Sequence, residues 1–226
     1  LEDGLISFEG GHAIYTPRLL VENVLNNLDL NGKILVMFNI EFLASLIYTF
    51  NVDHKRITFY SDHENKSYFC SALGVKYIDK LDHGMKFDVI LANPPYNSAV
   101  VSKREDAKNT NNSIIYFDFI KKTIGLASNS MSVIVPAALM HNDEMSKLVI
   151  DAGLESIEWV DPAYFPGVGI RSGISLFKVI RGYTGQITIR KNGVVYTISR
   201  DSTLSFDDPI KFQIVKKARL RNRLDE

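Results

Sequence analysis

Hydrophobic and polar positions follow two patterns that alternate along most of the chain. Short, nearly continuous apolar runs predict buried strands at residues 33–38, 56–61, 75–78, 87–92, 131–135 and 154–160. Between them, apolar residues recur at helical spacing and predict helices at residues 17–28, 41–50, 64–73, 114–124 and 144–152. In the first of these, Thr16 is a candidate cap and Pro17 suits the first turn. Alternating strands and helices predict a parallel sheet with helices on both faces.

The rhythm changes near residue 172, after which only strands are predicted. Residues 174–180, 186–190 and 194–199 are expected to be antiparallel, and Asn192-Gly193 is typical of a tight hairpin turn. A polar stretch at residues 97–112 has few apolar anchors and predicts a loop. These features divide the chain into an α/β domain, residues 1–182, and a β-hairpin with a basic helical extension, residues 183–226.

Composition limits the class of protein. Of the 226 residues 46% are hydrophobic and 11% aromatic, which is enough for a buried core, and the net charge is zero. A single cysteine, Cys70, predicts a small buried side chain and a reducing, cytoplasmic compartment. No apolar run is long enough to predict a membrane span, and the five histidines show no zinc-ligand spacing, so no metal is expected. Basic residues gather between Lys211 and Arg223, where a nucleic-acid contact and an ordinary solvated helix face are both open.

The most informative stretch is Asn93-Pro94-Pro95-Tyr96, directly after the predicted strand at residues 87–92. In open parallel sheets, ligands bind beyond the carboxyl ends of the strands. Two prolines stiffen the turn and supply no N–H, so the Asn93 side-chain oxygen and the Pro94 carbonyl can both accept hydrogen bonds from one –NH₂ group. Tyr96 adds an aromatic face.

This arrangement suits methylation of the adenine amine, which is a poor nucleophile because its lone pair is delocalised into the ring. Two acceptors on its two hydrogens favour a pyramidal nitrogen whose lone pair points at an electrophilic methyl group. Stacking on an aromatic ring contributes about 1–3 kcal/mol per base. The alternative is an ordinary proline-rich turn.

With these residues the chain resembles the gamma-class adenine-specific DNA methyltransferases of restriction–modification and phage systems, over roughly residues 12–182. The resemblance implies a Rossmann-like S-adenosylmethionine-dependent methyltransferase fold with an antiparallel last strand and a small β-rich C-terminal extension. It implies that Asn93 and Pro94 hold the amine of an adenine flipped out of DNA while Tyr96 stacks on it. It also implies DNA as a partner, a restriction nuclease or second subunit as a further one, and a target-recognition region that begins after about residue 183.

The resemblance implies further contacts, each with a structural alternative. Tyr15 and Thr16 would contact the cofactor, or simply precede a helix. Asp62, with Glu64 as a fallback, would bind the cofactor ribose, or cap the next helix. Asp79, with Asp82 as an alternative, would bind the cofactor adenine. Phe165 would meet the flipped base edge-on, in a loop that Gly167 and Gly169 let come close to a ligand and after which Arg171 could meet a phosphate. The alternative is that Phe165 is a hydrophobic plug in a glycine loop.

The loop after the first predicted strand departs from the pattern. Methyltransferases usually carry glycines there, whereas this chain has Phe38-Asn39-Ile40-Glu41. Phe38 and Ile40 are expected to crowd a ligand, and Asn39 and Glu41 are the candidate polar contacts. Two other functions therefore remain open: methylation of an amine in RNA or of a protein glutamine, and a catalytically inactive DNA-binding subunit.

Overall fold

A computed structural model describes residues 5–6, 15–61, 65–96, 115–165 and 173–201. The predictions for Asp62, Glu64, the loop at 97–112, Gly167 to Arg171 and the basic segment at 211–223 lie outside these residues. In the described part, no helix is long and apolar enough to cross a bilayer.

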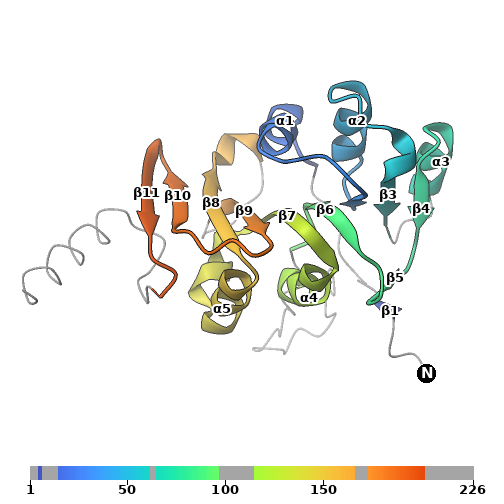
Figure 1. Ribbon diagram of the computed structural model, residues 1–226. Helices are drawn as coiled ribbons and strands as arrows, with labels where there is room; N and C mark the ends of the chain where they lie inside the picture. The colour runs from blue at the N-terminus through green and yellow to red at the C-terminus, as the bar shows by residue number, and fades with distance from the viewer. Residues whose placement is uncertain (1–4, 7–14, 62–64, 97–114, 166–172, 202–226) are drawn as a thin grey trace, which may run out of the picture.

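A nine-stranded sheet forms the centre of the described residues (Figure 1). Its order is β11-β10-β8-β9-β7-β6-β2-β3-β4. The strands are β2 (Ile34–Met37), β3 (Ile57–Tyr60), β4 (Lys76–Ile78), β6 (Phe87–Ala92), β7 (Ala127–Pro136), β8 (Leu154–Val160), β9 (Ile174–Ile180), β10 (Ile187–Lys191) and β11 (Val194–Ile198). Every strand predicted from the apolar runs is present, and β6, β8 and β9 have the predicted bounds. A small pair, β1 (Leu5–Ile6) with β5 (Leu81–Asp82), was not predicted, because two-residue strands carry no periodicity.

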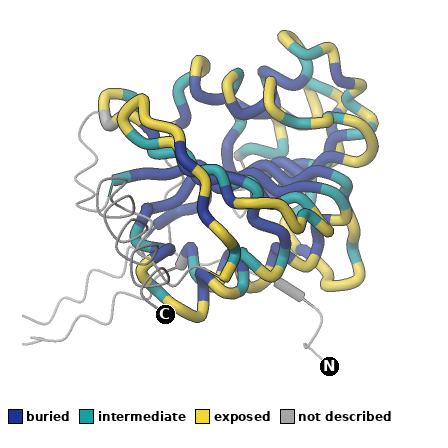
Figure 2. Tube along the Cα trace, turned by 60° about the vertical axis from the view of Figure 1, so that its left-hand side comes forward, coloured by how far each residue is buried: buried dark blue, intermediate teal, exposed yellow. Residues whose placement is uncertain are grey.

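Helices cover both faces of the sheet, as the alternating pattern predicts. They are α1 (Arg18–Asn26), α2 (Ile40–Tyr48), α3 (Asn65–Ala72), α4 (Ile115–Thr123) and α5 (Asp143–Asp151), with short 3₁₀ turns at His54–Arg56, Ile124–Leu126, Ala137–His141 and Pro162–Tyr164. Figure 1 shows α1 and α2 on one face and α4 and α5 on the other. The strands between these layers are largely buried (Figure 2), which explains their continuous apolar sequence. Cys70 is fully buried, and desolvation raises the pKa of its thiol to about 11.

The strand directions correct one prediction. Strands β2, β3, β4, β6 and β7 are parallel neighbours, and β9 runs antiparallel to both β7 and β8. The hairpin β10–β11 is antiparallel as expected, but β10 pairs with β8 in parallel. After β9 the chain reverses and passes to the far side of β8. Because β8 and β10 both run opposite to β9, they run in the same direction.

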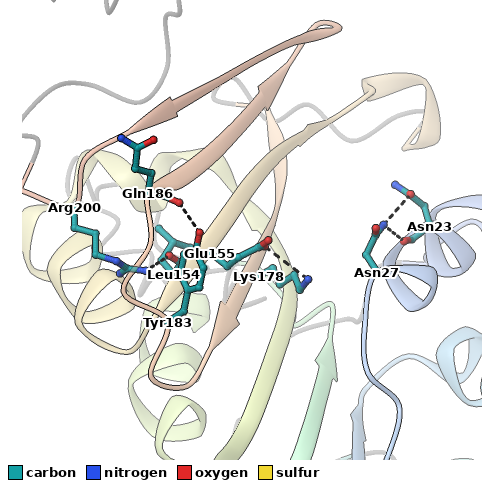
Figure 3. Close-up of polar contacts among 8 residues, drawn as sticks. All are labelled: Asn23, Asn27, Leu154, Glu155, Lys178, Tyr183, Gln186 and Arg200. Carbon is teal, nitrogen blue, oxygen red and sulfur yellow. Dashed lines mark hydrogen bonds and ion pairs between the residues drawn. The ribbon is translucent and has the colours of Figure 1, made fainter.

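The hairpin continues the main sheet. Asn192 and Gly193 have φ values of 51° and 73°, the left-handed pair of a two-residue hairpin turn. Arg200 fixes the end of the hairpin, since its guanidinium donates to the carbonyls of Gly185, Ile150 and Leu154 at 2.9, 2.7 and 2.7 Å. Figure 3 shows the bond to Leu154, with the ring of Tyr183 beside the guanidinium. The polypeptide from residue 183 to 201 therefore packs directly on α5 and β8.

The sheet changes its direction of growth between β2 and β6. From β2 the chain moves outward to β3 and β4, and it then returns to β6 on the other side of β2 and continues to β7. In parallel α/β sheets such a switch point leaves a crevice at the carboxyl ends of the two strands, where ligands bind. Met37 and Ala92, the last residues of these strands, are paired neighbours. Residues 38 and 93 therefore begin the two loops at this point.

The amino end of β6 is anchored by a carboxylate. The Asp88 side chain accepts hydrogen bonds from the backbone N–H of Lys33 at 2.7 Å and from the Ser128 hydroxyl at 2.9 Å. Gly32 beside it has a φ of +80°, and a Cβ there would lie 2.1 Å from the carboxylate. Only glycine permits this approach, and the contact joins β6 to the start of β2 and to β7.

Candidate active site at the carboxyl ends of β2 and β6

The turn Asn93-Pro94-Pro95-Tyr96 directly follows β6, as predicted, and all four of its residues are buried. Asn93 has no exposed surface and Tyr96 is 6% exposed. A buried amide needs hydrogen-bond partners, because an unpaired polar group in an apolar setting costs about 1–3 kcal/mol. The hydrogen-bond partners of Asn93 therefore decide which of its side-chain atoms is available to a ligand.

Asn93 is held at three atoms by three different parts of the chain. Its backbone N–H donates to the side-chain oxygen of Asn39 at 3.2 Å, and its side-chain nitrogen donates to the hydroxyl of Thr16 at 3.0 Å. Its side-chain oxygen accepts from the hydroxyl of Tyr96 at 2.9 Å. The side-chain nitrogen of Asn39 also donates to Thr16, at 3.3 Å. We call these four residues, Thr16, Asn39, Asn93 and Tyr96, the amide network.

Thr16 does not make the helix-capping bond predicted for it. Helix α1 begins after Pro17, and no side chain makes a capping bond there. Thr16 is fully buried in the amide network, whereas the neighbouring Tyr15 is 66% exposed. The predicted cap is wrong because the Thr16 hydroxyl is engaged by two amides from the loops after β2 and β6.

Tyr96 lies in an aromatic setting. Its ring centroid is 6.3 Å from that of Tyr116 on α4, edge to face, and Tyr116 in turn meets Phe117 at 4.8 Å. Burial raises the pKa of the Tyr96 hydroxyl far above its ordinary value and raises the pKa of Tyr116 to about 12. Tyr96 is therefore protonated at physiological pH and can act as the donor to Asn93.

The glycine-free loop after β2 keeps a backbone shape that favours glycine. Phe38 has a φ of 71°, and the N–H of Asn39 donates to the carbonyl of Met37 at 2.9 Å, which closes a γ-turn of the strained, positive-φ kind. The Phe38 ring is 2% exposed and lies 5.4 Å from Tyr60 and 5.9 Å from Phe119. A left-handed conformation costs a residue with a Cβ about 1–2 kcal/mol, which the buried ring offsets.

Two charged residues lie next to this turn. Lys66 on α3 donates to the carbonyl of Phe38. Burial raises the pKa of the Glu41 carboxyl, although its backbone hydrogen bond and the nearby Lys66 charge act in the opposite direction. A carboxylate and an ammonium at the end of β2 have the chemistry to bind the amino and carboxyl groups of a methionine. The side chains present therefore fit that end of S-adenosylmethionine, in a turn with the left-handed bend that glycine favours.

The other predicted site residues that the structure describes do not belong to the amide network. Asp79 is exposed and directly follows β4, so it lies on the side of the sheet where the carboxyl ends of β2, β3 and β4 meet. Asp82 belongs to β5 and accepts a hydrogen bond from the backbone N–H of Gly84 at 2.6 Å. Phe165 is 4% exposed and belongs to the hydrophobic core. Of the predicted site residues, the structure brings Thr16, Asn39, Asn93 and Tyr96 into one network and places Glu41 beside it on α2.

Lys66 and Tyr116 are neighbours of the site that were not predicted from the sequence. Neither stands in a motif, and each approaches from a helix that is distant in sequence. The amphipathic spacing of α4 predicts that Tyr116 faces inward, but it does not predict Tyr96 as the contact.

The profile of the Eco57I restriction-modification methylases matches residues 25–156, which is more than half of the chain. The chain belongs to this family. The matched segment includes β2, β6 and the Asn-Pro-Pro-Tyr turn. No curated protein sequence matches the chain significantly.

Solved structures share the methyltransferase fold. A chain of a type I restriction–modification system superposes with a TM-score of 0.59 at 14% identity, covering 91% of this chain and 49% of its own. A candidate class I S-adenosylmethionine-dependent methyltransferase from Listeria monocytogenes gives 0.53 at 13% identity, covering 90% and 70%. The DrdV–DNA complex gives 0.55 at 12% identity, covering 78% and 27%. This chain thus spans about half the length of the type I chain, and at these identities the likeness shows the fold alone.

Proposed function

We propose that this chain transfers a methyl group from S-adenosylmethionine to the exocyclic amine of an adenine flipped out of DNA. The observation that carries the proposal is the fixed orientation of Asn93. Its nitrogen donates to Thr16, and its oxygen accepts from Tyr96 within the double-proline turn. That oxygen and the Pro94 carbonyl are two acceptors at the switch point of the sheet, where the fold places ligands.

In this mechanism the target amine replaces the Tyr96 hydroxyl as the donor to Asn93. Tyr96 then turns so that its ring stacks on the base, which offsets part of the few kcal/mol that flipping costs. Holding the amine by both hydrogens directs its lone pair away from the ring. S-adenosylmethionine, when bound, would supply the electrophilic methyl group by cleavage of its S–CH₃ bond, with S-adenosylhomocysteine as the leaving group, and the methylated amine would lose one proton to solvent. Well-aligned reactants in such a site lower the barrier by about 7–11 kcal/mol.

For the cofactor we propose Glu41 and Lys66 at the methionine end. Asp62 is proposed for the ribose, Asp79 for the cofactor adenine and Tyr15 for an outer cofactor contact. Phe165 is proposed to meet the flipped base edge-on. DNA is the proposed partner, as it is in the DrdV–DNA complex, together with a nuclease or second subunit of a modification system. The region that reads the target sequence is proposed to begin after about residue 183, where the sheet already continues into β10 and β11.

A second candidate is a subunit that binds DNA without methylating it. The observation that favours it is Phe38, whose side chain stands at the position where methyltransferases usually have glycine. In that case a partner subunit would supply the functional cofactor site.

The test is methyl transfer from labelled cofactor into separate pools of unmethylated DNA, RNA and protein. We expect label in DNA, on the adenine amine. Label confined to RNA or protein would contradict the DNA proposal. Calorimetry with the cofactor separates the second candidate, since the absence of any heat of binding at millimolar cofactor, both alone and with DNA, would favour the inactive subunit.

A further inference from the structure

We infer that Thr16 is a positioning residue that orients the catalytic amide of Asn93, and that it is not a cofactor contact. This inference rests on the proposed function, because it assigns a task to the atom that would hold the target amine. It begins from burial: Thr16 and Asn93 have no exposed surface, and Asn39 is 2% exposed. Polar side chains buried this deeply are held by defined hydrogen bonds.

The direction of these bonds follows from one donor that cannot be reversed. A backbone N–H can only donate, so the 3.2 Å contact from Asn93 requires the oxygen of Asn39 to face it. The nitrogen of Asn39 must then point the other way, to the Thr16 hydroxyl at 3.3 Å. Asn39 is therefore fixed in one of its two amide orientations.

The Thr16 oxygen receives a second amide hydrogen from Asn93 at 3.0 Å. A hydroxyl oxygen has two lone pairs, and these two amides use both of them. With its nitrogen bound to Thr16, Asn93 presents its oxygen at the opposite end, where the Tyr96 hydroxyl donates at 2.9 Å. In this arrangement Thr16 holds the Asn93 amide with its oxygen toward Tyr96, so that Asn93 offers an acceptor, which is what an amine requires.

Removing the Thr16 oxygen should release this orientation. In Thr16→Val the Asn93 nitrogen loses its 3.0 Å hydrogen bond to Thr16, and rotation of the amide lets that nitrogen reach the Tyr96 oxygen instead. The turn would then direct the Asn93 side-chain N–H toward the target amine, which is itself a hydrogen-bond donor. Thr16→Ser keeps the oxygen and is the matched control.

The first experiment measures single-turnover methylation of unmethylated DNA at saturating S-adenosylmethionine, together with the cofactor Kd by calorimetry. We expect Thr16→Val to lower the rate about 10- to 100-fold, as the loss of one hydrogen bond at the reacting group predicts. The cofactor Kd should stay that of the wild type, and Thr16→Ser should retain the wild-type rate. A raised Kd with an unchanged rate at saturation would overturn the inference and make Thr16 a cofactor contact.

The second experiment needs no methyl transfer. The side-chain amide of Asn93, identified in NMR spectra by its loss in Asn93→Ala, should exchange slowly with solvent in the wild type and in Thr16→Ser. It should exchange faster in Thr16→Val, or in Thr16→Ala if the valine variant does not fold. Fast exchange in the wild type would overturn the inference. A protected amide in a protein that methylates no DNA would leave the positioning intact and refute only the proposed function.

Discussion

The hydroxyl of Tyr96 donates a 2.9 Å hydrogen bond to the side-chain oxygen of Asn93, three residues earlier in the same turn. The aromatic residue proposed to stack on the base therefore binds the atom proposed to hold the base. If the Tyr96 ring turns to stack on the base, its hydroxyl leaves the Asn93 oxygen. Base binding and the release of this hydrogen bond are therefore coupled.

Tyr96→Phe separates the two contacts. It should lower the free energy of unfolding by about 1 kcal/mol, because one buried hydrogen bond is lost, while the ring still stacks. Affinity for DNA with a mismatched target adenine should be equal to or tighter than that of the wild type, since no hydroxyl competes for Asn93. Tyr96→Ala should weaken the same affinity by about 1–3 kcal/mol. Chemical denaturation and fluorescence titration measure the two quantities, and equal affinities for the Phe and Ala variants would contradict the stacking role.

The strained turn at Phe38 predicts an inverted order of two variants. Phe38→Ala and Phe38→Gly both lose the buried ring, which costs about 3–5 kcal/mol. Because φ is 71°, glycine should be the more stable of the two by about 1 kcal/mol. At Phe42, a fully buried residue inside α2, alanine should instead be the more stable by about 1 kcal/mol. Urea denaturation tests this, and alanine above glycine at both positions would show that Phe38 carries no backbone strain.

Asp88 predicts a dependence of stability on pH. Its pKa is lowered from 3.8 first by the hydrogen bond from the Lys33 N–H and then by the one from Ser128. A lowered folded-state pKa gives stability that is present above pH 3.8 and is lost as the pH falls through the folded value. Asp88→Asn should therefore lower the unfolding free energy at pH 7 by about 1 kcal/mol, after solvent screening is allowed for, and by less near pH 3.

Ser128→Ala, which removes one of these two bonds, should show the same trend with a smaller difference. Urea midpoints at the two pH values provide the measurement. A gap between Asp88→Asn and the wild type that stays constant from pH 7 to pH 3 would contradict the assignment.

The large features of the fold could be predicted from sequence because they depend on local periodicity. The apolar runs at residues 87–92, 154–160 and 174–180 became strands with the same bounds. The parallel pairing of β10 with β8 could not be predicted, because it depends on which side of β8 the chain passes after β9. Periodicity records burial along a strand but not the identity of its neighbour.

The site was predictable in part for the same reason. Asn93 and Tyr96 stand in a motif, and their position after a buried strand could be derived from the pattern. The contacts of Thr16 with Asn39 and Asn93 join residues 23 and 77 positions apart, so no local signal encodes them. Phe38 was expected to crowd a ligand, but its ring lies instead between Tyr60 and Phe119, since the positive φ turns it into the core.

The proposed methylation of adenine in DNA depends on Asn93, whose side-chain oxygen would bind the target amine. The most direct measurement is to map N6-methyladenine in the DNA of cells that express the wild-type chain or Asn93→Ala, with the folding of both checked by circular dichroism. We expect methylated adenines in one short sequence context with the wild type and none with Asn93→Ala. DNA free of the modification despite a folded wild type that binds S-adenosylmethionine, or equal modification by both proteins, would contradict it.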